Sequence, residues 1–526
     1  MTRRILMSGF AGLLFGLAFR GLAGAAAEPA SPGAAAAPPA ATEAKAPPAV
    51  RLVPGRGSYA VVIGEAAYAD PEWRKVAEAL QQKHDAAVIV YPGAVTETRA
   101  ALARVFPRYA CFVARPTEAG RDFVVAVHRL TRMLDDDPYT DCLWGILTGY
   151  DAGDALRIAQ FKTPLVVRRA AAGTGIDLGA FDEGRWFSEG EKGAMVEKPA
   201  GGQAEKKQVP PDTTEMIVNT LNDLKPDLFL TSGHATERDW QIGYSYKNGQ
   251  LRCRQGQLFG VDLAGKEFPV NSPNPKVYLP AGNCLIGHVP GPDCMAAALM
   301  HTGGVYQMFG YVVVTWCGYG GWGVRDLFVG QPGRYTLAEA FYLNNQALVH
   351  QLQTRFPQSA GVSFARFDME RDPRLLGKLA AEHGLLNAER NNLRDRDEMG
   401  LLWDRDTVAF YGDPAWEARL APRPLAWQQS ITESGGTYVF TLTANADGGW
   451  SRPPMIFLPH RVKDARIIEG AEFAPLITDN FLLLAKPAKF EKGKTYKVVF
   501  RLKGDRPLGG EEQRGAAQEG QVGPGH

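Results

Sequence analysis

His234 and Cys284, two residues of types used in nucleophilic catalysis, each follow a short apolar stretch of the chain. Residues 228–231 precede Ser-Gly-His234, and residues 277–280 precede Ala-Gly-Asn-Cys284. A short apolar run that ends at a glycine and a reactive side chain is typical of a buried parallel strand. Open parallel sheets carry their chemistry at the carboxyl ends of such strands. If the two strands are neighbours, the imidazole and the thiol face one crevice, and we hypothesise a Cys/His pair.

This pair suits acyl transfer. A neighbouring imidazole lowers the pKa of a thiol and can later protonate a leaving amine. The negative charge that develops on the substrate oxygen needs backbone donors, and the amides of Cys284, of Ala235 and of Gly233 lie at suitable positions. A single buried cysteine is more often inert core, and a metal site formed with His288 is a weaker alternative. The strand-end position of both residues favours the catalytic hypothesis.

The elements around the pair predict an α/β fold. Before residue 168, expected strands at 59–63, 86–91, 109–114 and 142–147 alternate with amphipathic helices, which indicates a parallel sheet. A second α/β unit contains both strands that lead to the pair, then a strand at 305–309 and a helix at 337–352. From residue 437 onward, short strands at regular spacing indicate an immunoglobulin-like sandwich. We therefore expect two doubly wound α/β subdomains followed by a small all-β sandwich.

The boundaries of these parts follow from changes in composition and periodicity. Residues 168–211 show no periodicity and are expected to form a long loop or linker. The Ala/Pro-rich stretch before the first strand is a stiff spacer, and the polar end of the chain is expected to be disordered. We assign a signal peptide at 1–27, a linker at 28–57, a scaffold subdomain at 58–167, the loop at 168–211, the catalytic subdomain at 212–422, the sandwich at 423–504 and the tail at 505–526.

The start of the chain predicts export. Arg3 and Arg4 precede an apolar run at 5–19, and small residues follow up to Ala27, as in a cleavable signal peptide. A membrane anchor is the alternative, but glycines and Arg20 interrupt the run. We expect a secreted or periplasmic protein with no integral membrane segment after cleavage. The net charge of +1 gives no general reason to bind nucleic acid, and the oligomeric state is unknown.

The strand-end pair resembles that of the caspase-like superfamily of cysteine peptidases, and within it the gingipain-type enzymes. The His-to-Cys separation is 284 − 234 = 50 residues, which agrees with the spacing known for caspases. The stretches 137–141, 296–304 and 411–415 also resemble the family, and the likeness extends over residues 59–502. The resemblance implies an exported cysteine endopeptidase that acts on proteins or peptides through a thioester. It implies no organic cofactor and allows a structural calcium ion, although no EF-hand-like loop is present.

The same resemblance points to further site residues. Trp316 and Tyr319 resemble an aromatic loop, at 316–321, that walls the substrate cleft in relatives. Glu237 and Asp239 could orient His234 or attract a basic substrate side chain, against the simpler interpretation of solvated loop carboxylates.

The chain departs from the family at two positions next to the pair. Ala235 stands where the family usually has glycine, and Asn283 stands where a smaller residue is common. Two alternatives remain open: a catalytically inactive, gingipain-like interaction protein, and an exported two-lobe ligand-binding protein with Cys284 in its core.

Overall fold

The computed structural model describes residues 49–502, apart from residues 388, 391 and 451. The expected signal peptide, residues 28–48 of the expected linker at 28–57 and the expected tail at 505–526 lie outside the described residues. The end of that linker is not a spacer, because Arg51–Val53 forms a strand of the central sheet. Within the described part of the chain, no helix combines the length and the apolar character that crossing a membrane requires.

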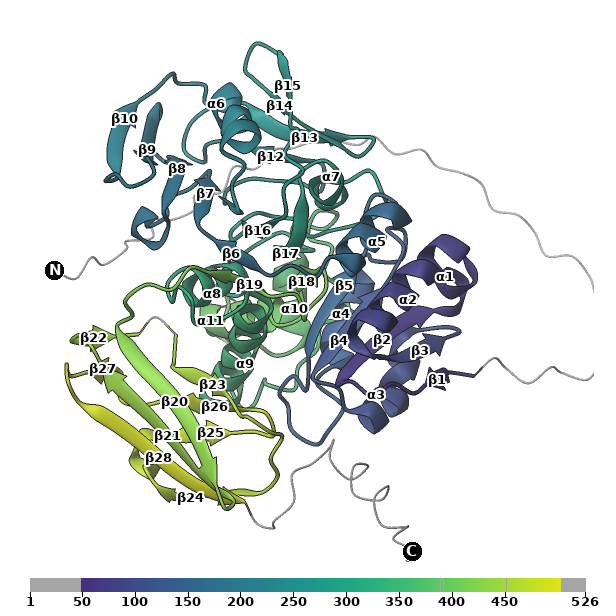
Figure 1. The fold of residues 1–526 in the computed structure, drawn as a ribbon, viewed down its shortest axis with the longest axis vertical. Coiled ribbons are helices and arrows are strands. Elements are labelled where there is room, and N and C mark those ends of the chain that lie inside the picture. Colours follow the sequence, from purple (N-terminus) through teal and green to yellow (C-terminus); the bar gives the residue numbers. More distant parts are fainter. Residues whose placement is uncertain (1–48, 388, 391, 451, 503–526) are drawn as a thin grey trace, which may run out of the picture. The chain divides into compact units, whose positions relative to one another are not determined.

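A single 13-stranded sheet forms the centre of the fold, in the order β1-β3-β2-β4-β5-β18-β17-β16-β11-β7-β8-β9-β10 (Figure 1). Its first half contains strands that run parallel to one another from β3 to β18, with β1 antiparallel at the edge. The strands of this half are β1 (Arg51–Val53), β3 (Ala87–Tyr91), β2 (Tyr59–Gly64), β4 (Tyr109–Val113), β5 (Leu143–Leu147) and β18 (Val408–Tyr411). Its helices are α1 (Glu65–Ala69), α2 (Pro71–His84), α3 (Arg99–Val105), α4 (Arg121–Leu130) and α5 (Ala152–Gln160).

The second half of the sheet runs in the opposite direction, because β17 is antiparallel to β18. From β17 to β8 its strands are again mutually parallel. These strands are β17 (Val305–Tyr311), β16 (Lys276–Pro280), β11 (Leu228–Thr231), β7 (Arg169–Ala172) and β8 (Glu183–Phe187). The accompanying helices are α6 (Thr214–Asn219), α7 (Met295–His301), α8 (Tyr319–Phe328), α9 (Leu337–Arg355), α10 (Leu375–Glu382) and α11 (Arg396–Asp404). The chain therefore has the predicted α/β class, with the two α/β units joined in one sheet.

The segment 168–211, expected to be a long loop, instead adds strands to this sheet. β7 and β8 continue the parallel half, and β9 (Ala194–Lys198) and β10 (Glu205–Gln208) pair antiparallel at its edge. β10 is exposed along its whole length and carries two lysines, as edge strands that avoid further pairing commonly do. Such a strand lacks the alternating apolar pattern on which strand prediction depends.

A small antiparallel sheet lies between β11 and β16 in the sequence. It contains β12 (Asp239–Gln241), β13 (Gln250–Arg254), β14 (Gln257–Val261) and β15 (Glu267–Pro269). A further two-stranded pair joins β6 (Leu165–Val167) to β19 (Ala418–Leu420). Residues 242–249 connect β12 to β13, its antiparallel neighbour.

The predicted C-terminal sandwich is present with its own hydrophobic core, centred on Phe440, Leu442 and Val498. Its sheets contain β20 (Trp427–Ser434), β21 (Thr437–Ala444), β28 (Thr495–Leu502) and β24 (Ala465–Glu469), then β23 (Met455–Phe457), β26 (Phe481–Leu484) and β25 (Pro475–Ile477), and the pair β22 (Gly448–Gly449) with β27 (Lys489–Phe490). Sequence reasoning missed β20, because this edge strand is mostly polar and exposed.

Candidate active site

The strand ends that precede His234 and Cys284 lie side by side. β11 and β16 pair in parallel, with Leu228 opposite Val277 and Thr231 opposite Pro280. His234 follows the end of β11 by 234 − 231 = 3 residues, and Cys284 follows the end of β16 by 284 − 280 = 4 residues. Both residues therefore leave the sheet at the same edge, as the two apolar runs in the sequence suggested.

Asn283 connects the two strand ends through its side chain. Its Oδ1 accepts a hydrogen bond of 2.7 Å from Thr231 Oγ1, and its Nδ2 donates to the carbonyl of Gly233 at 3.1 Å. The side chain is fully buried, so leaving these groups without partners would be costly. A residue that looked like a departure from the family pattern thus holds the segment before His234 against the segment before Cys284.

The Cys284 thiol lies against the loop that follows β17. Its Sγ accepts a hydrogen bond from the backbone amide of Thr315 at 3.3 Å, and Thr315 Oγ1 donates to the carbonyl of Asn283 at 3.0 Å. Burial raises the pKa of the Cys284 thiol, while the hydrogen bonds from Thr315 act in the opposite direction. In the free protein the thiol form is therefore favoured at neutral pH.

The residue after Cys284 has an unusual backbone conformation. Leu285 has φ = 58°, in the left-handed region that bulky side chains rarely adopt. Two hydrogen bonds to the end of β17 hold this turn: Leu285 N donates to Val313 O at 3.0 Å, and Gly287 N donates to Tyr311 O at 2.9 Å. Strained residues of this kind cluster at functional sites, where the surrounding structure enforces them. This turn holds the thiol at the strand end.

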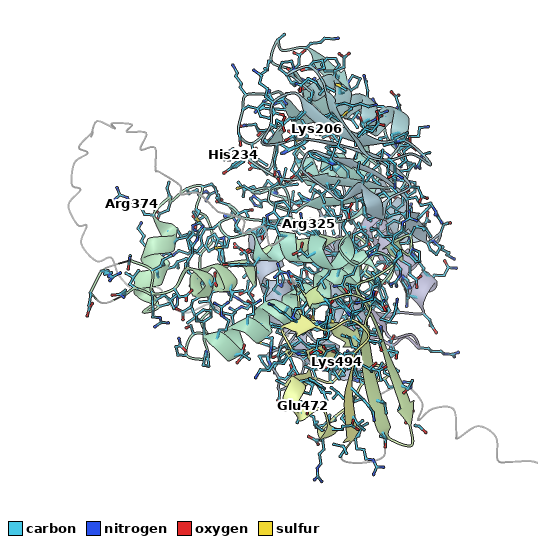
Figure 2. All side chains as sticks on the ribbon, turned by 90° about the vertical axis from the view of Figure 1, so that its left-hand side faces the viewer. Lys206, His234, Arg325, Arg374, Glu472 and Lys494 are labelled. Atoms are coloured by element: carbon cyan, nitrogen blue, oxygen red, sulfur yellow. The ribbon has the colours of Figure 1, made fainter. Side chains whose placement is uncertain are left out.

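The His234 imidazole is exposed and is positioned by an aromatic ring. Figure 2 shows His234 at the edge of the molecule. The ring of Tyr244 stacks on it with a centroid distance of 4.9 Å and an interplanar angle of 24°. Among the described residues, no side chain or backbone group hydrogen-bonds the His234 ring, and none joins it to the Cys284 thiol. The imidazole is thus oriented by stacking alone in the free protein.

Tyr244 is itself fixed by Glu189. The amides of Tyr244 and Ser245 donate to the backbone carbonyl of Glu189 at 2.7 and 3.0 Å. The Glu189 carboxylate accepts a hydrogen bond from Thr174 Oγ1 at 2.7 Å and another from the Ser232 hydroxyl. Glu189 therefore links the ends of β7 and β11 to the loop that carries Tyr244.

Backbone donors are available beside the pair. Ala235 faces Trp240 across an isolated antiparallel bridge. The flanking bonds, Gln241 N to His234 O and Thr236 N to Asp239 O, leave the Ala235 amide outside the bridge. Within the described residues, the amides of Ala235, Gly233 and Cys284 donate no backbone hydrogen bond. These three amides are the ones that the sequence predicted as oxyanion donors, and that role stays a prediction. Gly233, with φ = 95°, needs glycine for its conformation.

The predicted substrate-wall residues pack on α11. The guanidinium of Arg396 lies 5.3 Å from the centroid of the Trp316 ring, and the Tyr319 hydroxyl donates to the Asp397 carboxylate. The expected loop at 316–321 is shorter than predicted, because α8 already begins at Tyr319 after a left-handed Gly318. Trp316 directly follows Thr315, whose amide donates to the Cys284 thiol. The Tyr319 hydroxyl, in contrast, is directed to α11.

The predicted acidic residues Glu237 and Asp239 lie in the turn beyond His234, and neither carboxylate hydrogen-bonds the imidazole in the described structure. The backbone carbonyl of Glu237 accepts from Met295 N at 2.7 Å. Burial lowers the pKa of His288, and the Glu237 carboxylate opposes this shift. Asp239 belongs to β12 and lies opposite Arg252.

Sequence reasoning missed Glu189 and Trp322. A Cβ atom on Gly282 would lie 3.3 Å from the Trp322 ring and 3.4 Å from Cβ of Ser232, so the indole lies over the strand ends. Arg325 lies 4.6 Å from the Trp322 ring centroid. The Gly-Gly-Trp sequence could have drawn attention to Trp322, but Glu189 lies in a segment with no pattern.

One carboxylate cluster has the spacing of metal ligands, and it lies outside this site. Oxygen atoms of Asp135, Asp141 and Asp479 all lie within 4.8 Å of one another. Arg461 already pairs with Asp479, and burial raises the pKa of Asp141 to about 8. Because Arg461 already neutralises Asp479, two carboxyl groups remain for an ion, fewer ligands than calcium or magnesium usually takes. We assign no ion to it.

Comparison with known proteins finds distant structural neighbours only. No family model and no curated protein matches the chain. The crystal structure of the Arg-specific cysteine proteinase gingipain R (RgpB) aligns with a TM-score of 0.38 and 10% identity, over 85% of this chain and 92% of that one. The complex of Porphyromonas gingivalis RgpB pro- and mature domains aligns with a TM-score of 0.36 and 11% identity, over 85% and 93%. This likeness concerns the fold alone, and no residue role is transferred from it.

Proposed function

We propose that the protein is an exported cysteine endopeptidase with Cys284 as nucleophile and His234 as proton carrier. The observation that supports this most directly is the parallel pairing of β11 and β16, which brings both residues to one edge of the sheet. The left-handed Leu285 next to the thiol is a second, independent sign of a functional site. Tyr244 takes the orienting role that a third hydrogen-bonding residue has in many Cys/His sites.

The chemistry follows in two acyl-transfer steps. His234 takes the thiol proton as the Cys284 sulfur attacks the scissile carbonyl, and the oxyanion accepts hydrogen bonds from the free amides of Ala235 and Cys284. His234 then gives that proton to the leaving amine, and a thioester remains. Water, deprotonated by His234, attacks the thioester and releases the acid and the thiol. The thiol and imidazole are not hydrogen-bonded in the free protein, so substrate binding must bring them within reach.

Glu189 suggests a preference for basic substrates. Its carboxylate has two hydroxyl donors, Thr174 and Ser232, and no cationic partner among the described residues. A carboxylate at the strand ends with no counter-charge attracts a guanidinium or ammonium group. We extend the proposal to peptides that carry arginine or lysine before the cleaved bond.

Fluorogenic peptides with Arg, Lys, Leu or Ala before the cleaved bond test this function. The wild-type protein should hydrolyse the Arg or Lys peptides fastest, and Cys284→Ala should lower kcat/KM by on the order of 10⁴-fold or more. Cys253→Ala is the matched control, because this partly buried thiol lies on β13 and should be dispensable. Equal hydrolysis by wild type and Cys284→Ala would refute the proposed nucleophile.

A non-catalytic interaction role is the second candidate. The raised pKa of the Cys284 thiol and the missing hydrogen bond to His234 are the observations that favour it. A folded wild-type protein that hydrolyses none of the peptides would support this role.

A further inference from the structure

A cavity of about 490 Å³ lies where the α/β part of the chain continues into the sandwich. The start of α9, the end of β19, the connecting segment 422–429 and the β23 strand all contribute to its wall. Arg334, Arg419 and Arg423 are among its lining residues. This volume is within the range of small-molecule sites, which are typically about 300–1,000 Å³. The cavity lies apart from the strand ends that carry His234 and Cys284.

Arg334 is a partly buried cation that lacks an anionic partner. Its guanidinium donates to Gln331 Oε1 at 2.7 Å and to the carbonyl of Trp427, and it lies 4.7 Å from the Trp427 ring centroid. Among the described residues it forms no ion pair with a carboxylate, and burial lowers its pKa. Buried charges in proteins are normally paired, because removing a charge from water is costly. The Arg334 guanidinium therefore lacks a negatively charged group beside it.

Arg423 adds an unused donor to the same cavity. Its Nε–H is buried and has no hydrogen-bond partner among the described residues, while its terminal nitrogen donates to Asp182. Such orphaned donors are rare in folded proteins and indicate a missing partner.

The carboxylate in the wall does not supply the missing charge. Glu339 Oε2 accepts the amide of Thr336 at 2.8 Å, where it caps α9, and it lies 3.4 Å from Arg419. It is thus committed to the helix start and to a different arginine. Asp182 already pairs with Arg423, and Glu339 lies beside Arg419, so Arg334 is the guanidinium of the wall that has no carboxylate partner among the described residues.

Part of the cavity wall is apolar. Leu425, Ile456 and Phe457 face the cavity and are each partly buried. A bare inorganic anion would leave this surface uncovered. A ligand that fits both parts of the wall has a carboxylate at one end and an apolar body at the other.

We propose that this cavity binds a small organic carboxylate with an apolar body. The carboxylate accepts charge-assisted hydrogen bonds from Arg334 and, once the Arg423 side chain turns its buried Nε–H toward the cavity, from Arg423. The apolar body covers Leu425, Ile456 and Phe457. The ligand would then contact both the α/β part and the sandwich. This site does not depend on the proposed peptidase function.

Titration calorimetry on the full chain tests the site with benzoate as the probe. Benzoate should bind, and its neutral isostere benzamide should bind at least about tenfold more weakly, because a charge-assisted hydrogen bond contributes about 1.4 kcal/mol or more. Arg334→Gln and Arg423→Gln should each weaken benzoate binding by about tenfold or more. Arg423→Lys keeps the charge but removes the Nε–H, so it should fall between wild type and Arg423→Gln.

Arg466→Gln is the matched control, since this exposed arginine lies on β24 in the sandwich and away from the cavity wall. Its benzoate affinity should equal that of the wild type. Equal binding of benzoate and benzamide, or inorganic phosphate binding more tightly than benzoate, would overturn the proposal. So would unchanged benzoate affinity in Arg423→Gln with its thermal unfolding transition intact.

Discussion

The two halves of the central sheet each carry a histidine and a cysteine among polar groups, and the surroundings of these residues differ in almost every physical respect between the halves. In the first half, His84 Nε2 lies 2.8 Å from a carboxylate oxygen of Asp413, and Lys83 Nζ lies 2.9 Å from the same oxygen. The Tyr59 ring stacks on His84 at 4.2 Å, and its hydroxyl donates to the other Asp413 oxygen at 2.8 Å. Burial raises the pKa of Cys111, which lies beside Tyr59.

In the second half of the sheet, His234 and Cys284 make fewer contacts and are more exposed to solvent. The His234 ring is exposed and has only the Tyr244 stack, and the Cys284 thiol is partly buried at a strand end. By hydrogen bonding alone, the His84–Asp413 pair looks more like a catalytic site than His234 does. The Asp413 carboxylate, however, is fully buried and already paired with His84, Lys83 and Tyr59, and the His84 side chain is only 17% exposed. A catalytic pair must be within reach of the substrate, and the exposed His234 with the partly buried Cys284 meets this condition better than the buried Asp413 and Cys111.

Exchanging the two histidines for alanine is the strongest test of this comparison. His234→Ala should lower kcat/KM for the best fluorogenic peptide by about 10²–10⁴-fold, the range for loss of a general acid–base residue, without changing thermal stability. His84→Ala should lower stability and leave kcat/KM per folded molecule unchanged. The reverse pattern would place the active site in the first half of the sheet.

We expect replacement of Asp413 to lower the free energy of unfolding strongly, whereas replacement of His234 is expected to lower activity. Burial alone would raise the pKa of Asp413, but hydrogen bonds and charges from His84 and Lys83 outweigh it and hold the pKa well below its ordinary value. Asp413→Ala leaves Lys83 without its partner, so the free energy of unfolding should fall by about 3–5 kcal/mol. Urea unfolding curves measure this change.

The same pair gives a pH dependence of known sign. A depressed carboxylate pKa contributes stability that is present above the ordinary Asp pKa and is lost as pH falls through the depressed value. The stability difference between wild type and Asp413→Ala should therefore shrink as the buffer is taken from neutral pH to strongly acidic pH. A difference that grows on acidification would contradict the assigned ion pair.

The stacking of Tyr244 on His234 should have a moderate effect. Aromatic stacking contributes about 0.5–1.5 kcal/mol, so Tyr244→Ala should lower kcat by up to about tenfold with little change in KM. Tyr244→Phe keeps the ring and should retain activity. The proton NMR signal of the His234 ring should also move in Tyr244→Ala alone, a change that a general loss of stability would not produce.

The smallest expected effect is a difference in thiol reactivity. Cys284 is partly exposed, whereas Cys111 is fully buried, so iodoacetamide should label Cys284 and spare Cys111 in the native protein. Because burial raises the Cys284 pKa, less thiolate is present at neutral pH, and the labelling rate should rise as pH increases above neutral. Peptide mass mapping after timed labelling measures both rates, and preferential labelling of Cys111 would reverse the comparison.

Sequence reasoning reached the strands that lead to the pair because each is short, apolar and followed by glycine. It missed the cluster in the first half because Asp413 lies more than 300 residues from Tyr59 in the chain (|i−j| = 354), and no local pattern links them. For the same reason it missed Glu189, whose partners come from three separate elements. It placed β10 in a loop and did not identify β20 within the sandwich, because both edge strands are mostly polar and exposed.

The role of Asn283 could not be read from the sequence. Taken as a single residue, it is only larger than expected before a catalytic cysteine. Its bonds to Thr231 and to the Gly233 carbonyl depend on the register of β11 against β16, which only the folded chain supplies.

The position of β18 in the sheet has a consequence for how the chain folds as it is synthesised. β5 ends at residue 147, but the strand that covers its free edge, β18, begins at residue 408. During synthesis, some 260 residues (408 − 147 = 261) must emerge before that edge is closed. An open strand edge is a template for pairing with other chains. Nascent chains that stop before residue 408 should therefore aggregate or recruit chaperones, and chains that extend past residue 411 should not.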